Sequence, residues 1–203
     1  MKKLSLALLL IWGILSAQSS AELYQRLSSR YSKLTSFQAN LEQHNFYYGL
    51  NKEISYQGKI YFQAGKLLMS FSEPNVQRLY IDKGKAELYD GASHILYKSD
   101  ILPEYSRMNP LEILQLYWDQ AKVQILENSN GHSRVKLSLQ KDPMLKEIEA
   151  LIDDNTGLVK ELSYIDNSDN VVSYYFTKIL IDTKIPEDVW LYNYPEDTQI
   201  IAP

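Results

Sequence analysis

The histidines are the residues best suited to chemistry in this 203-residue chain, which contains no cysteine. His44, His94 and His132 lie far apart in the sequence, and none stands at metal-ligand spacing from a carboxylate or another histidine. A zinc-type site needs several such side chains close together, because each of them supplies one ligand. We therefore expect surface or structural histidines, no metal site and no cofactor.

The carboxylate pairs are the second candidate for chemistry. Glu147 and Glu149 alternate along the sequence, and Asp153 and Asp154 lie at a turn, a placement typical of a solvated face. The G-x-S-x-G, G-x-G-x-x-G and P-loop motifs are absent from the sequence. Glycoside hydrolysis by two carboxylates stays open as an alternative. The residues as a whole favour a protein that is not an enzyme.

The elements that must position a binding site are mostly strands. Tyrosine, with 16 copies against 5 phenylalanines, favours strands and half-buried surfaces. Alternation of apolar and polar residues predicts antiparallel strands joined by hairpins, with glycine or asparagine in the turns. The expected strands cover residues 37–42, 54–63, 67–71, 78–81, 87–89, 94–98, 123–127, 133–139, 147–153, 158–165 and 171–181.

Two helices accompany these strands. From Glu22 to Leu34 the apolar residues recur every three or four positions, as an amphipathic helix requires. Asn109-Pro110 is a natural N-cap and first-turn pair. The apolar spacing that follows it predicts a short helix over residues 110–119.

One segment, residues 142–152, allows two interpretations. It could form a helix capped by Asp142, but residues 154–157 look like a hairpin turn, so we expect a strand in its second half. The whole is then one long antiparallel sheet with two helices. Such a sheet must curl or close to protect its edges and its apolar face. The helices would either cover an open apolar pocket or simply fill the core.

The first 21 residues have the features of a secretory signal peptide. Met1-Lys2-Lys3 is followed by an apolar run from Leu4 to Leu15 and by small residues up to Ala21. A membrane anchor is the alternative, but a helix of about 12 residues spans only about 18 Å of a roughly 30 Å hydrocarbon core. We expect cleavage after Ala21, with Ala17 as the alternative site, and export to the periplasm.

Removal of residues 1–21 would leave one domain, residues 22–203, with 19 basic and 25 acidic side chains and a net charge of −6. This charge argues against nucleic acid as a partner. No segment in the middle of the chain reads as a linker, so we expect a single domain that acts as a monomer. Without cysteines, its stability must come from a hydrophobic core.

Several short motifs occur in the order and spacing of one protein family, and together they resemble the periplasmic outer-membrane lipoprotein carrier family, LolA. The resemblance covers essentially all of the chain after the signal peptide. The motifs are Leu34-Thr35-Ser36-Phe37-Gln38-Ala39 with Gln43, Gly58-Lys59-Ile60-Tyr61-Phe62, Lys66 to Phe71 followed by Pro74, Asp82-Lys83-Gly84 before Leu88-Tyr89, Ile152-Asp153 with Gly157, Tyr164 to Asp166, and Trp190 to Pro195.

The resemblance implies a single α+β domain: a highly curved, incomplete antiparallel β-barrel with an N-terminal helix and a short helical lid. It implies a soluble periplasmic carrier, or chaperone, whose apolar cavity binds the acyl chains of lipoproteins and shuttles them from the inner to the outer membrane. The lipoprotein would come from an inner-membrane ABC-type transporter and pass to an outer-membrane acceptor. The absence of a cysteine for lipidation favours the diffusing carrier over an anchored acceptor. A sensor or interaction module of the same fold, binding a protein partner or another lipid, is the alternative.

One position departs from the family pattern. Members typically carry an arginine in the strand before a tyrosine-x-x-proline segment, where it bonds to the helical lid. Alignment on Phe71 and Pro74 places Leu68 at that position. The resemblance therefore implies that control of the lid by this arginine is absent or has moved.

One face of the expected strands supplies the candidates for a lipid-binding cavity, because side chains alternate between the two faces of a strand. Ordinary core packing is the alternative for each, and a register error of one residue would send the whole set to the opposite face. The candidates are Phe37, Ala39, Leu41, Ile60, Phe62, Leu67, Met69, Phe71, Leu79 and Ile81, with Leu114 and Trp118 from the short helix.

Overall fold

The computed structural model describes residues 19–63, 65–100, 110 and 112–202. The signal-peptide prediction for residues 1–18 lies outside these residues. The helices are α1 (Ser20–Ser32) and α2 (Ile113–Tyr117), with short 3-10 turns η1 (Tyr48–Leu50), η3 (Trp118–Gln120) and η4 (Glu187–Trp190). The strands are β1 (Ser36–Tyr47), β2 (Lys52–Gln63), β3 (Lys66–Glu73), β4 (Gln77–Asp82), β5 (Lys85–Asp90), β6 (Ile95–Asp100), β7 (Lys122–Ser129), β8 (His132–Ser138), β9 (Leu145–Asp153), β10 (Val159–Asp166), β11 (Val171–Ile181) and β12 (Gln199–Ile201).

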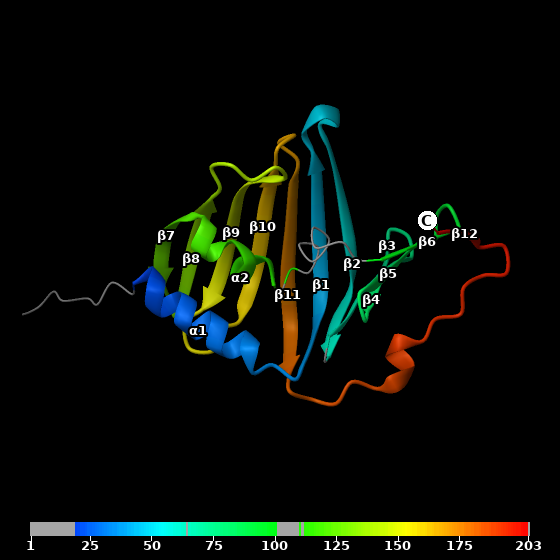
Figure 1. Ribbon diagram of the computed structural model, residues 1–203, viewed down its shortest axis with the longest axis horizontal. Helices are drawn as coiled ribbons and strands as arrows, with labels where there is room; N and C mark the ends of the chain where they lie inside the picture. Colours follow the sequence, from blue (N-terminus) through cyan, green and yellow to red (C-terminus); the bar gives the residue numbers. More distant parts are fainter. Residues whose placement is uncertain (1–18, 64, 101–109, 111, 203) are drawn as a thin grey trace, which may run out of the picture.

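The strands form one open sheet in the order β12-β6-β5-β4-β3-β2-β1-β11-β10-β9-β8-β7. Its centre is β1, which pairs with β2 on one side and with β11 on the other, so that two hairpin series meet there (Figure 1). The neighbours from β1 to β11 are antiparallel, as the sequence predicted. The sheet is not closed, because β7 and β12 form its two separate edges.

Two details of the strand prediction were decided by long-range pairing. Residues 145–153 form β9 between β8 and β10, so the strand interpretation of this segment is confirmed and the helical alternative is wrong. The strand β12 was not predicted; it pairs parallel with β6, so the expectation of a purely antiparallel sheet is wrong at this edge. Its three residues carry too short a pattern to be read from sequence.

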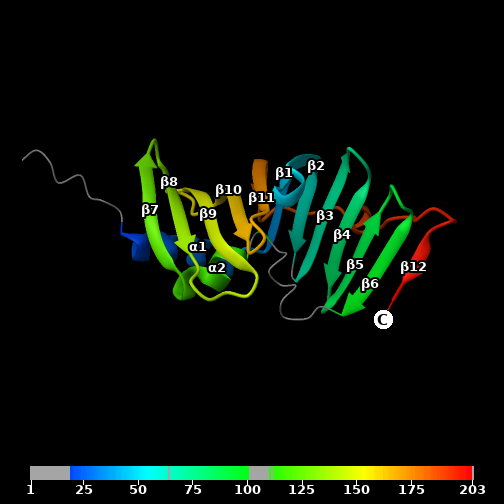
Figure 2. The same cartoon turned by 90° about the horizontal axis from the view of Figure 1, so that it is seen from above.

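The sheet twists strongly along its length. Figure 1 shows β7 to β11 with their broad side toward the viewer and β3 to β6 nearly edge-on, whereas Figure 2 shows the broad side of β3 to β6. Right-handed twist accumulates from strand to strand. Over twelve strands it turns the two ends of the sheet to face different directions and leaves one face concave enough to hold helices.

The two faces of the sheet carry two separate apolar clusters. On β3, Leu67 and Met69 belong to the large core beneath the helices, whereas Leu68 belongs to a small cluster with Ile185 and Trp190. Because neighbouring side chains on a strand point to opposite sides, these clusters lie on opposite faces. We call the face covered by the helices the inner face and the other the outer face.

The helix α1 begins at a complete capping box. The Ser19 hydroxyl accepts a hydrogen bond from the Glu22 N–H at 3.2 Å, and the Glu22 carboxylate accepts one from the Ser19 N–H at 3.2 Å. This box satisfies backbone donors that the first turn leaves unpaired. The helix starts two residues before the expected Glu22 and buries Leu23 and Leu27 on the inner face.

The helix α2 is shorter than predicted. The sequence placed it over residues 110–119, but the α-helix starts at Ile113 behind Glu112 as N-cap, and a 3-10 turn follows it from Trp118. Asn109, the expected cap, lies outside the described residues. Pro110 is buried in a turn instead of opening the helix. The tertiary fit of Ile113, Leu114, Tyr117 and Trp118, all buried, outweighs the local capping preference.

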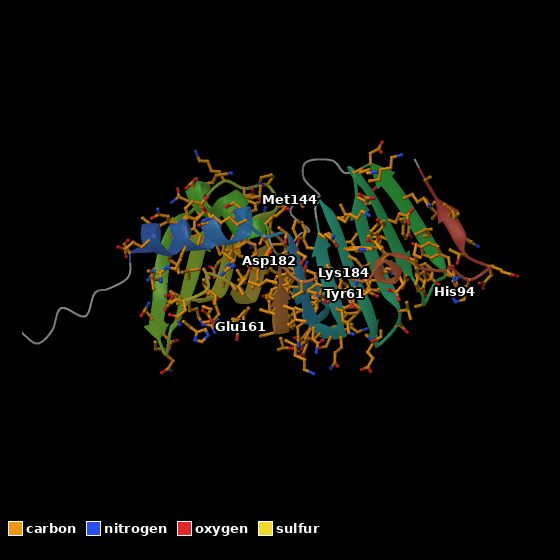
Figure 3. All side chains as sticks on the ribbon, turned by 90° about the horizontal axis from the view of Figure 1, so that it is seen from below. Tyr61, His94, Met144, Glu161, Asp182 and Lys184 are labelled. Carbon is orange, nitrogen blue, oxygen red and sulfur yellow. The ribbon has the colours of Figure 1, made fainter. Side chains whose placement is uncertain are left out.

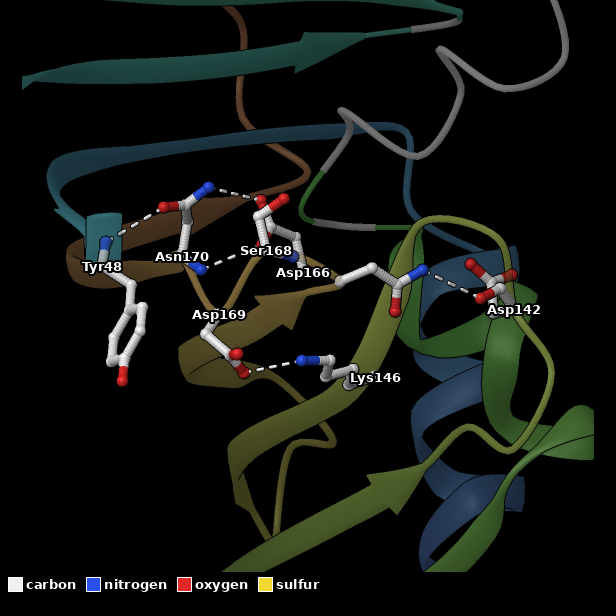
Figure 4. A network of polar contacts seen from close by, with 8 residues as sticks. Tyr48, Asp142, Lys146, Asp166, Ser168, Asp169 and Asn170 are labelled. Carbon is white, nitrogen blue, oxygen red and sulfur yellow. Dashed lines mark hydrogen bonds and ion pairs between the residues drawn. The ribbon is translucent and has the colours of Figure 1, made fainter. Parts of the chain in front are cut away.

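Polar contacts tie the β10–β11 turn to its neighbours (Figure 4). The Asp166 carboxylate accepts hydrogen bonds from the Ser168 and Asn170 N–H groups at 2.8 and 2.9 Å. The Asn170 side-chain oxygen in turn accepts from the Tyr48 N–H at 3.0 Å, and Lys146 pairs with Asp169 at 2.7 Å. The polar side chains of this exposed turn therefore hold it in place against β9 and the turn after β1.

Candidate functional site

The candidate site is a cavity of about 470 Å³ on the inner face, between α1, β2 and α2. Tyr31 and Tyr24 come from α1, Leu34 follows it, and Phe62 comes from β2. Glu112, Gln115 and Leu116 complete the lining from the α2 side. Tyrosine rings and aliphatic side chains make most of this wall, so the cavity suits a largely apolar ligand.

The structure brings the twelve predicted cavity residues together in one apolar cluster on the inner face. Only Phe62 among them lines the cavity; Phe62 and Ile81 are partly buried, and the other ten are at most 6% exposed. Their register is the expected one, but their side chains are already packed against each other and the helices. A direct role in lipid contact stays a prediction for all twelve.

The lining residues that the sequence analysis missed come mainly from the two helices. Leu34 and Tyr31 lie on the apolar stripe that predicted the first helix, and Tyr24 lies beside it. The stripe was therefore the available signal. It did not show which of its residues pack against the sheet and which face a gap, because that depends on where the helix lies on the sheet.

The helix α1 is fixed to the turn between β9 and β10. The Arg30 Nε donates to the Thr156 carbonyl at 3.0 Å, and an Arg26 guanidinium N–H donates to the Asp154 carbonyl. A Cβ at Gly157, whose φ is +72°, would lie 2.9 Å from the Arg26 carbonyl oxygen. This close approach and the positive φ both favour glycine at the turn.

The tyrosines of α1 extend its attachment into the cavity wall. The Val159 N–H donates to the Tyr31 hydroxyl at 3.1 Å, and burial raises the pKa of Tyr31 to about 12, so this phenol stays neutral. The Tyr24 ring stacks on Trp118 with centroids 5.2 Å apart and a 20° interplanar angle. The helix α1 therefore contacts the turn η3, which follows α2, directly.

Leu68 faces away from both helices. It is 1% exposed and packs on the outer face with Ile185 and Trp190. A side chain at this position does not reach the inner face, so the aligned position could not contact the helices even as an arginine. The contacts that the structure shows for α1 come from Arg26, Arg30 and Tyr31.

Part of the outer face, at β2 to β5, is covered by residues 182–198, which we call the strap. The strap leaves β11 at Asp182 and crosses β2 near Tyr61, where Figure 3 labels Tyr61 close to Lys184. The Trp190 ring lies 6.4 Å from Tyr61 and 6.3 Å from Tyr80. The strap thus closes the apolar part of this face before the chain ends as β12.

Arg78 holds the strap down. Its Nη2 donates to the Trp190 carbonyl at 2.9 Å and to the Val189 carbonyl at 3.3 Å, and its guanidinium lies 5.1 Å from the Tyr192 ring centroid. The residue is 5% exposed, and its burial lowers the pKa of the guanidinium. Two carbonyl acceptors and an aromatic face compensate the buried cation.

A second hollow, of about 590 Å³, lies on the outer face between the strap and β1 to β3. Asn40, Lys59, Ser70 and Thr177 line it in one cross-strand row that ends at Arg78. Although it is the larger hollow, its polar and charged lining suits an acyl chain less well than the cavity on the inner face.

The histidines occupy separate surface positions. His44 contacts Glu53 and Glu42 at 2.9 and 2.8 Å, and His94 contacts Asp197 at 2.7 Å beside β12. The residues that the structure describes contain no group of three or more potential metal ligands. The roles visible for His44 and His94 are ion pairs that join strands or chain segments.

Solved structures of low sequence identity share this fold. An uncharacterized conserved protein from Thermus thermophilus matches with a TM-score of 0.59 and 14% identity, over 92% of this chain and 100% of that chain. MucB of Pseudomonas aeruginosa, solved in complex with MucA, matches with a TM-score of 0.53 and 13% identity, over 85% of this chain and 60% of that chain. This chain thus spans about three fifths of the MucB chain.

One further match has a TM-score below 0.5. A LolA superfamily protein from Nitrosomonas europaea matches with a TM-score of 0.44 and 9% identity, over 88% of this chain and 100% of that chain. No protein-family model matches the sequence, and no curated protein matches it significantly. At these identities the likeness concerns the fold alone.

Proposed function

We propose that this protein is a periplasmic carrier that binds acyl chains of lipoproteins in the cavity between α1, β2 and α2 and shuttles them from the inner to the outer membrane. The observation that carries the proposal is a cavity between the helices and an open sheet, walled mostly by aromatic and leucine side chains. Burial of each methylene group contributes about 0.8 kcal/mol, so such a cavity can hold an acyl chain without covalent chemistry.

The carrier needs no catalytic residue, only a donor and an acceptor. The sequence motifs that resemble LolA support an inner-membrane ABC-type transporter as donor and an outer-membrane protein as acceptor. No helix among the described residues is both long enough and apolar enough to cross a membrane. Transfer between two membranes requires a carrier that can leave both, which makes export to the periplasm part of the proposal.

Signal cleavage after Ala17 fits the proposed export better than cleavage after Ala21. The helix α1 starts at Ser20 and uses Ser19 as its N-cap, and a cut after Ala21 would remove both residues. Loss of a serine N-cap typically costs about 1 kcal/mol. The intact mass of the exported protein tests this: a chain that begins at Gln18 is expected, and one that begins at Glu22 would contradict it.

Binding of a fluorescent fatty-acyl probe, together with release of lipoprotein from inner-membrane preparations, tests the carrier. Phe62→Asp places a charge in the cavity wall and is expected to abolish both activities. Leu50→Asp, at a site that is 74% exposed in the β1–β2 turn, is the matched control and is expected to leave both unchanged. Absence of both activities in the folded wild-type protein would overturn the proposal.

A second candidate function is supported by the fold shared with MucB, which was solved in complex with MucA. In this case the protein is an envelope sensor or interaction module that binds a protein partner or another lipid. Capture of one periplasmic protein in a stoichiometric complex, with no lipoprotein released from membranes, would favour this function over the carrier.

A further inference from the structure

We propose that the inner-face cavity binds one acyl chain at a time. This chain can belong to a single-chain lipid or to a lipoprotein. The inference rests on the proposed function, because it concerns the same cavity. Its volume of about 470 Å³ is the starting point. A methylene group fills roughly the 30 Å³ that one water molecule takes in the liquid, so the cavity matches about 16 methylene groups. A lipoprotein that carries three acyl chains of that length would need about three times this volume to bury all of them.

The floor beneath the cavity offers no further room. Ile60, two positions before Phe62 on β2, is fully buried, and Met69 and Phe71 on β3 are 5% and 6% exposed. These side chains belong to one continuous packed core. Protein cores have few voids larger than a water molecule, so a second chain would have to displace core side chains.

The helical side of the cavity is also held in place. The helix α1 is attached to the β9–β10 segment through Arg30 and Tyr31, and its Leu23 and Leu27 are 0% and 1% exposed. Tyr24 stacks on Trp118 at the other end of the wall. To admit three chains, the helix would have to break these contacts together. Packed or bonded elements therefore bound the site at the sheet and at α1.

A chain-length series measures how much of one chain the cavity accepts. Purified protein is titrated with lysophosphatidylcholines whose single acyl chains contain 10 to 22 carbons, and stoichiometry is read by native mass spectrometry. The affinity is expected to rise up to roughly fourfold per methylene group. It should level off near about 16 carbons, where the cavity is full. A rise that continues unchanged to 22 carbons would overturn the inference.

Synthetic peptides that carry one or three palmitoyl chains on the same sequence distinguish the two sources of the chain. One bound chain predicts 1:1 complexes with both peptides and similar affinities, since the two additional chains stay outside. A triacylated peptide that binds more than tenfold tighter and protects all three chains would overturn the single-chain inference but support the carrier. If neither peptide nor lysolipid binds, the proposed function itself fails.

Two matched variants test the location. Leu116→Trp adds volume at the cavity wall and is expected to move the plateau to shorter chains. Leu126→Trp makes the same change on β7, away from the cavity lining, and should leave the plateau unchanged. The two leucines are similarly exposed, Leu126 by 43% and Leu116 by 40%. An unchanged plateau in a folded Leu116→Trp variant, or equal shifts in both, would contradict the assignment.

Discussion

The inner face of the sheet is covered by the helices α1 and α2, whereas the outer face of β2 to β5 is covered by the extended strap (Figures 1 and 2). A helix is a stiff cylinder about 10 Å wide, so it cannot follow a twisted sheet closely. An extended segment can bend with the strands beneath it. The helical cover leaves an apolar cavity at α1 and α2, while the strap places Trp190 directly on Tyr61 and Tyr80.

The two covers also differ in what attaches them. The helix α1 buries leucines in the large core, whereas the strap is held by Ile185 and Trp190, by the buried cation of Arg78 and by Tyr192 and Tyr194, which pack on Tyr89. Among the described residues, the strap buries fewer apolar side chains than the two helices with the turn η3. We expect the inner-face core to stabilise the whole domain and the outer cover to open locally, because fewer buried apolar side chains hold it. Substitutions on each face test this comparison.

The largest effect is expected on the inner face. Phe37 is fully buried and lies edge-on to Phe176 with centroids 6.1 Å apart. Phe37→Ala should lower the free energy of unfolding by about 3–5 kcal/mol, because it leaves a cavity in the core. Urea denaturation followed by circular dichroism measures the change. Tyr48→Ala, at a 64% exposed site, is the control and should change stability by less than about 0.5 kcal/mol.

The second effect is expected on the outer face and should be local. Trp190→Ala removes the largest side chain of the small cluster and is expected to cost about 3 kcal/mol, the lower end of the range for buried aromatic residues. Hydrogen exchange should accelerate in the strap and β12 but not in β7 to β11. Equal acceleration throughout the sheet would break the comparison between the faces.

Arg78→Met should have a smaller effect on the same cover. It removes the donor to the buried Trp190 carbonyl and to the part-buried Val189 carbonyl, and one unsatisfied buried acceptor costs about 1–3 kcal/mol, so we expect a loss of about 2 kcal/mol. The expected result is faster exchange in the strap and a lower midpoint in urea. Arg78→Lys keeps the charge but loses the planar donor geometry, so an intermediate effect is expected. An unchanged strap in Arg78→Met would show that the hydrogen bonds of Arg78 are not needed to hold it.

The smallest effect is a pH dependence at the outer surface of β1. Hydrogen bonding to Glu53, and further contacts with Glu42, raise the pKa of His44. The protonated form therefore stabilises the folded state below about pH 6.5. This contribution is lost as the pH rises through the folded-state pKa.

Because His44, Glu42 and Glu53 are partly solvated, their contribution to the free energy of unfolding should stay below about 0.5 kcal/mol and weaken with salt. Unfolding of the wild type and of His44→Gln from about pH 5 to about pH 8 measures the difference. A wild-type advantage that grows with rising pH would contradict the assignment.

Local sequence pattern predicted most of the sheet. Strand parity placed Phe37, Ile60 and Met69 on one face, because alternation is a property of each strand by itself. The turn at Lys83-Gly84, with φ of +49° and +76°, was likewise visible as a glycine signal. The start of α2 at Ile113 was not visible in the sequence, because its position depends on packing against distant residues.

Local sequence was enough to locate every strand except β12, the apolar face of most of them and the amphipathic helix that precedes them. These properties depend on neighbours only a few positions apart. The tertiary structure alone decided that β1 pairs with β11, that the strap crosses the outer face and that Tyr24, Phe62 and Leu116 surround one cavity. Each of these brings together residues far apart in the chain, and the twist of the assembled sheet, not any local pattern, determines where they meet.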